Sequence, residues 1–134
     1  MMKVNFLTLC DFAQDNQGKL SIMGTFNRIL ANTVPFTYTT PFYIVARVVS
    51  KESACGKIKM TCIAPDGGTI SQSPEIAFSI QDQNNDGHEK YANFIMGFQN
   101  TSFKQFGTYR FRFEILDGEA AETELYLEKV PESN

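Results

Sequence analysis

The stretch from 107 to 128 alternates apolar and polar residues with a period of two on both sides of a central Asp-Gly pair. Because successive side chains of a strand point to opposite faces, this period predicts two strands that each bury one face. Asp117 and Gly118 lie between them, and both tolerate the positive φ of a tight hairpin turn. We therefore predict an antiparallel hairpin. The side chains expected to face its core are Tyr109, Phe111, Phe113, Ile115, Ala121, Thr123, Leu125 and Leu127.

Shorter runs of the same period recur along the rest of the chain, and none sustains the 3.6-residue period of a helix. Turn-forming residues separate the runs at 15–18 (Asp-Asn-Gln-Gly) and 65–68 (Pro-Asp-Gly-Gly). Pro35 and Pro41 bracket a connection too rich in proline for a central strand. Segment 99–106 has room for a short helical turn. Strands are expected at 4–13, 19–29, 42–50, 57–64, 75–81, 91–98, 107–116 and 121–130.

Many short strands separated by turns predict an all-β domain. The predicted architecture is a two-sheet antiparallel sandwich, immunoglobulin-like or a related Greek key. A closed eight-stranded barrel is the alternative, because inside and outside alternate in the same way in both folds. The 134 residues suffice for one domain with a substantial core, so a single domain over 1–134 is expected.

Strand 4–13 is apolar on both faces. Leu7 and Leu9 occupy one face, so the strand is expected to be covered on both sides. The other face is expected to hold Val4, Phe6, Thr8, Cys10 and Phe12.

The net charge and the distribution of charged residues indicate which class of partner the chain can bind. The formal net charge is −3, and the Lys and Arg residues are scattered, so no basic face is available for nucleic acid. No run approaches the roughly 20 apolar residues of a membrane-spanning helix. We therefore expect a protein partner, and neither nucleic acid nor membrane. An acidic row is interpreted as a solvated strand face: Glu119, Glu122, Glu124 and Glu128.

The three cysteines, Cys10, Cys55 and Cys62, predict a cytoplasmic protein, because an odd count without a secretory signal is typical of reduced thiols. The alternative is an exported lipoprotein, since Lys3 and a short apolar run precede Cys10. Leu9 counts against it, because lipid attachment favours Gly, Ala or Ser at that position.

The only histidine, His88, lies in a polar segment, and no nucleophile motif accompanies it. A hydrolytic triad would need it beside an activated Ser or Cys and a carboxylate. We assign no catalytic residue and no cofactor, and the expectation leans against an enzyme. A site assembled from residues scattered in sequence stays open.

The same segment begins like a calcium-binding loop, with alternate oxygen-bearing side chains followed by Gly87. The pattern then fails, because Asn93 stands where a bidentate Glu is required and Glu89 where an apolar residue is expected. A plain polar loop is therefore expected rather than a metal site. The candidate ligands are Asp82, Asn84, Asp86 and the backbone carbonyl of His88.

An aromatic segment is the other candidate binding feature. Exposed rings on an extended segment stack on sugars or receive a peptide. The alternative, which we favour, is that alternate rings pack under the edge of the sandwich. The residues concerned are Phe36, Tyr38, Phe42 and Tyr43.

Several segments resemble a bacterial family of small β-sandwich proteins of unknown function. They are Leu9–Gln14, Gly18–Gly24, Asn27–Ile29, Phe42–Val48 and Phe106–Phe111. The resemblance spans most of the chain and implies the fold, with no activity to carry over. Gly107-Thr108-Tyr109 also resembles the start of a late strand in immunoglobulin-like domains, which favours the sandwich over the barrel.

The leading functional hypothesis is a non-enzymatic interaction or scaffold module. The alternative is a module that binds a small ligand or carbohydrate, assisted by calcium through loop 82–87 or by the aromatic segment. An apolar cavity would favour the ligand, and an exposed apolar patch or a free sheet edge would favour protein contacts.

Overall fold

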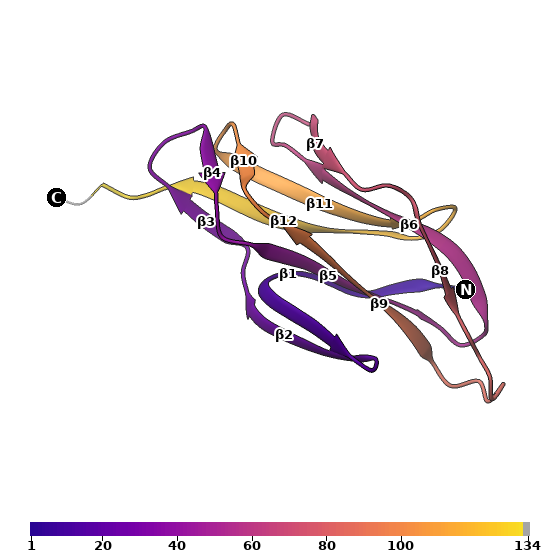
Figure 1. Cartoon of the computed structure of the whole chain (residues 1–134). Helices are drawn as coiled ribbons and strands as arrows, with labels where there is room; N and C mark the ends of the chain where they lie inside the picture. Colours follow the sequence, from indigo (N-terminus) through magenta and orange to yellow (C-terminus); the bar gives the residue numbers. More distant parts are fainter. Residues whose placement is uncertain (133–134) are drawn as a thin grey trace.

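The computed structural model describes residues 1–132, and every regular element in that range is a strand (Figure 1). The strands are β1 (Lys3–Asn16), β2 (Lys19–Thr25), β3 (Arg28–Ala31), β4 (Phe36–Tyr38), β5 (Phe42–Ser50), β6 (Ala54–Ile63), β7 (Thr69–Gln72), β8 (Ile76–Ile80), β9 (Lys90–Phe98), β10 (Thr101–Phe103), β11 (Gly107–Ile115) and β12 (Ala120–Lys129).

The strands form two large sheets and one small one. Sheet A has the order β2-β1-β5-β9, and sheet B has the order β3-β12-β11-β6-β7, with β8 also paired to β6. Strands β4 and β10 pair only with each other at one end of the molecule. All the pairs are antiparallel except β12 with β3. The predicted sandwich of two antiparallel sheets is thus confirmed, and among residues 1–132 no sheet closes into a barrel.

The hairpin of β11 and β12 has the predicted faces, because Phe111 lies opposite Thr123 and Tyr109 opposite Leu125. Asp117 turns the chain with a φ of 62°. Phe111 and Leu125 have no exposed surface, because they lie between the two sheets. The apolar faces of β5 and β9 cover them from the other side. Rings dominate this core: Phe42 packs edge-on against Phe111 with centroids 6.2 Å apart.

The sequence did not predict four short strands as separate elements, namely β3, β4, β7 and β10. Segment 99–106 contains β10 and not the expected helical turn, because Thr101–Phe103 pairs with β4. Strand β7 pairs with β6 just after the predicted turn at 65–68. The expected strand 19–29 is divided: β2 stays in sheet A, and the chain crosses to sheet B as β3. Strands of three or four residues are too short to show a period.

The predicted faces of β1 are wrong at Val4, because the strand contains a bulge. The register shifts between Val4 and Phe6, so Val4 pairs with Val48 on the core side. Phe6, Thr8 and Cys10 share one face, as predicted, and it is the outer one. One extra residue at a bulge reverses the side-chain alternation beyond it.

Tyr109 holds the connection between β10 and β11 in place. Its side chain is buried, and its hydroxyl donates to the Gln105 carbonyl at 2.7 Å and accepts from the Gln105 N–H at 3.3 Å. A hydrogen bond from a tyrosine near the start of a late strand to the backbone a few residues upstream recurs in Greek-key sandwiches. Burial raises the pKa of this phenol.

Candidate interaction surface

The outer face of sheet B is charged. Arg110 lies opposite Glu124, and Arg112 lies opposite Glu122 with 4.0 Å between their charged atoms. Glu114 continues the pattern beside Lys59 of β6. Opposite charges directly across a pair of strands stabilise a sheet modestly and keep its face solvated. The acidic row that the sequence places here is thus interleaved with basic residues.

The outer face of sheet A is apolar. Phe12, Met23 and Tyr91 are 47%, 64% and 43% exposed. Phe12 and Met23 lie on the β1–β2 hairpin, which folds back over this face so that its turn contacts Tyr91. We call the apolar residues of this face and of the hairpin over it the sheet A patch. The patch consists of Phe6, Cys10, Phe12, Met23, Tyr43, Val45, Val49, Tyr91 and Ile95.

Part of the sheet A patch is buried without belonging to the core. Cys10 and Val45 have no exposed surface, yet neither lies in the cluster between the sheets. The β1–β2 hairpin covers both residues, because it crosses this face to reach Tyr91 and Asn93 of β9. The outer face therefore carries a second apolar layer of packed side chains.

Arg47 of β5 lies on the same face, beside Phe6 and Tyr91 of the sheet A patch. Its guanidinium carbon lies 3.8 Å from the ring centroid of Tyr91 and 5.7 Å from that of Phe6. Its Nε donates to the Asn93 Oδ1 at 2.8 Å. A cation over an aromatic face is attracted by the ring quadrupole. Arg47 is thereby held flat on the patch.

The β1–β2 turn docks on the end of β9 beside the patch. The Tyr91 hydroxyl donates to the Gly18 carbonyl at 2.7 Å, and the Asn93 amide donates to the same oxygen at 3.1 Å. The Asn93 amide also lies 3.2 Å from the Asp15 carboxylate. These bonds hold the end of the β1–β2 hairpin against β9, so that the hairpin lies over the outer face of sheet A.

Loop 82–90 places an ammonium group between the carboxylates proposed for calcium. The Lys90 Nζ lies 2.9 Å from the Asp82 Oδ1 and also bonds the Asp86 carboxylate. Asp82 and Asp86 further accept backbone N–H groups from Asn85 and His88. Hydrogen bonding to these carboxylates raises the pKa of Lys90, and the bond from Lys90 lowers the pKa of Asp86. A calcium ion would have to displace Lys90 from both oxygens.

The remaining loop candidates are His88 and Asn84. The His88 side chain is exposed, as expected, with Nδ1 3.3 Å from the Asp86 carboxylate. Asn84 is exposed. Within residues 1–132 no group of three or more His, Cys, Asp or Glu side chains is arranged to hold a metal ion.

The aromatic segment does not form an exposed platform. Phe42 has no exposed surface and stacks on Phe98 in the core, with centroids 5.0 Å apart, so its candidate role in ligand stacking is corrected. Phe36 and Tyr38 are half-buried in β4 and pack against the same core. Tyr43 alone points outward, within the sheet A patch. Phe42 and Tyr43 point to opposite faces of sheet A, because successive side chains of a strand alternate.

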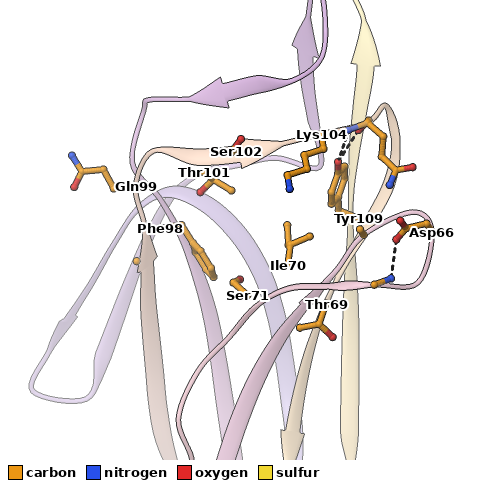
Figure 2. A pocket seen from close by; sticks show the side chains of 14 residues that line it. Asp66, Thr69, Ile70, Ser71, Phe98, Gln99, Thr101, Ser102, Lys104 and Tyr109 are labelled. Atoms are coloured by element: carbon orange, nitrogen blue, oxygen red, sulfur yellow. Dashed lines mark hydrogen bonds between the residues drawn. The ribbon is translucent and has the colours of Figure 1, made fainter.

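A cleft of about 730 Å³, which the sequence did not predict, opens at the end of the sandwich where β7 faces β9 and β10. Figure 2 shows Lys104 and Thr101 on one side, Ile70 and Ser71 opposite, and Phe98 between them. Its lining comes from three sheets and three connections, so no local sequence pattern predicts it.

One known protein family matches most of this chain. A family model described as "Family of unknown function (DUF6941)" matches residues 5–128. The chain belongs to this family. The predicted resemblance to a family of unknown function is thereby confirmed. The search of curated proteins finds no match.

Among solved structures, a beta-glucosidase from Listeria innocua is similar at 10% sequence identity and a TM-score of 0.47. The similarity covers 96% of this chain and 16% of the glucosidase chain. The chain thus spans about a sixth of that protein, and nothing about activity follows from the match. Within residues 1–132 there is no helix long and apolar enough to cross a membrane.

Proposed function

We propose that this domain is a non-enzymatic interaction module that binds a partner protein through the sheet A patch. The observation that carries the proposal is the contrast between the two outer faces. Sheet B presents paired charges, whereas sheet A presents exposed Phe12, Met23 and Tyr91 over buried Cys10 and Val45. Contiguous apolar surface on a soluble domain marks sites of protein association.

The composition and order of the patch support this proposal. Aromatic residues, Met and Arg are enriched at the centres of protein interfaces, and all three kinds occur together here. Arg47 is already held by Tyr91 and Asn93, so binding costs little side-chain entropy at this position. The proposal places the domain in the cytoplasm, where the free thiols of Cys10, Cys55 and Cys62 are compatible with the redox environment.

The experiment is a native pull-down from the source cells with the tagged wild-type protein and two variants. Phe12→Asp puts a charge into the sheet A patch. Leu30→Asp is the matched control, because Leu30 is 48% exposed, like Phe12, but lies on β3 of sheet B. We expect Phe12→Asp to abolish recovery of the partner and Leu30→Asp to preserve it. Equal recovery with both variants would contradict the proposal.

A sedimentation measurement on the purified protein distinguishes a partner protein from a second copy. A dimer that Phe12→Asp dissociates would show that the patch joins two identical chains. A monomer of the wild type supports a different protein as the partner.

A further inference from the structure

Two edge strands border the 730 Å³ cleft. Strand β7 pairs with β6 on one side, and β10 pairs with β4 on one side. Within residues 1–132, neither strand has a partner on its other side. Figure 2 shows β7 and β10 running across the cleft roughly side by side, with β4 beyond β10. Backbone N–H and C=O groups on an unpaired edge are a template for another extended segment.

The side chains of the cleft combine apolar and cationic recognition. Ile70 is 41% exposed, and the half-buried ring of Phe98 lies between the two strands. Lys104 follows β10 and points toward Ile70 across the cleft (Figure 2), and its ammonium has no ion pair among the described residues. The cleft therefore offers an apolar wall, one free positive charge and main-chain groups.

We propose that an extended segment of a partner protein enters this cleft as an additional strand between β7 and β10. Its main chain pairs with the free edges, one apolar side chain packs on Ile70 and Phe98, and an acidic side chain meets Lys104. In strand addition, main-chain hydrogen bonds supply affinity and pockets for alternate side chains supply specificity. A compact small molecule would leave the two strand edges unpaired.

This site is separate from the sheet A patch and does not depend on the proposed function. The patch lies on the outer face of sheet A, whereas the cleft opens between β7 of sheet B and the β9–β10 connection. A variant of the patch such as Phe12→Asp is expected to leave peptide binding in the cleft unchanged.

The probe is a displayed library of random seven-residue peptides, selected on the immobilised 134-residue chain. We expect the enriched sequences to alternate apolar residues with an acidic residue and to contain no proline. A synthetic enriched peptide is then titrated by fluorescence anisotropy. Lys104→Glu should weaken its binding about tenfold, because an attraction becomes a repulsion. Lys51→Glu is the matched control, since Lys51 follows the opposite end of β5 from the Phe42–Phe98 pair.

Methylation of the peptide's backbone amides tests strand pairing without altering the protein. Removal of those N–H donors should abolish binding, and the unmodified peptide should slow amide hydrogen exchange at Ile70, Ser71, Thr101 and Ser102. Failure to enrich acidic peptides, affinity insensitive to Lys104→Glu or to methylation, or loss of binding in Phe12→Asp would each overturn the proposal. Dimerisation of the free protein with slowed exchange at these same amides would make a second copy the occupant and would likewise overturn it.

Discussion

Arg47 and Tyr91 lie on adjacent strands of sheet A, with the guanidinium carbon 3.8 Å from the centre of the phenol ring. The Tyr91 hydroxyl is meanwhile bonded to the Gly18 carbonyl of the β1–β2 turn. The ring thus connects Arg47 to the hairpin that lies over this face. The patch is ordered before any partner binds.

This stacking should be measurable as an energetic coupling. In a double-mutant cycle with Arg47→Met and Tyr91→Leu, we expect an interaction free energy of about 0.5–2 kcal/mol, the range for cation–π pairs from exposed to desolvated sites. Urea unfolding of the four proteins provides the values. Strictly additive losses would show that the two side chains are merely neighbours.

The hydroxyl of Tyr109 should contribute more to stability than that of an exposed tyrosine. Tyr109→Phe removes a bond donated to the Gln105 carbonyl and one accepted from its N–H, so we expect a loss of about 1–3 kcal/mol. Tyr126→Phe is the control, because its hydroxyl only donates to the exposed Glu124. Its effect on urea unfolding should stay within about 0.5 kcal/mol. Similar losses for both variants would contradict the structural role of Tyr109.

The ion cluster of loop 82–90 predicts a defined titration. The bond from Lys90 lowers the pKa of Asp86, so the stabilisation that this carboxylate provides is present above its ordinary pKa and is lost as the pH falls through the lowered value. The raised pKa of Lys90 acts at the other limit, since its contribution is lost as the pH rises through that value. Carboxyl-carbon NMR should show the Asp86 midpoint moving upward in Lys90→Met. An unchanged midpoint would mean that the contact does not persist in solution.

The cysteines should differ in reactivity. Burial raises the pKa of Cys62 to about 12 and also raises the pKa of Cys10, so both remain protonated at neutral pH. Cys55 is exposed. A thiol reagent should label one cysteine rapidly in the native protein and three after unfolding without reductant. Detection of a single thiol in the unfolded chain would indicate a disulfide and contradict the cytoplasmic proposal.

The sequence predicted the features that depend on the local period of apolar residues and on turn residues. The alternation of Tyr109, Phe111 and Phe113 defines the core face of β11, and Asp117-Gly118 specifies the turn. Strands β4 and β10 were missed, because three residues carry no period and their pairing brings Phe36 and Phe103 together from distant parts of the chain. The bulge between Val4 and Phe6 depends on pairing with β5, which β1 alone does not reveal.

The candidate surface required the fold before it could be recognised. The sequence predicted that the first strand is covered on both sides, and Leu9 and Cys10, on opposite faces, are both buried. It did not show that the β1–β2 hairpin itself folds back over β5 and β9 to provide the outer cover. The calcium motif could be recognised in the sequence, but only the structure shows what occupies its carboxylates. Lys90, four residues after Asp86, bonds both Asp82 and Asp86.

The most direct test of the sheet A patch is site-specific photo-cross-linking in the source cells. A photoreactive phenylalanine analogue replaces Phe12, Met23 or, as reference, Leu30, whose exposed fractions are 47%, 64% and 48%. We predict that positions 12 and 23 yield a cross-link to the same partner protein and that position 30 yields none. Cross-links of equal strength from all three positions, or from position 30 alone, would contradict the assignment of this face as the interaction surface.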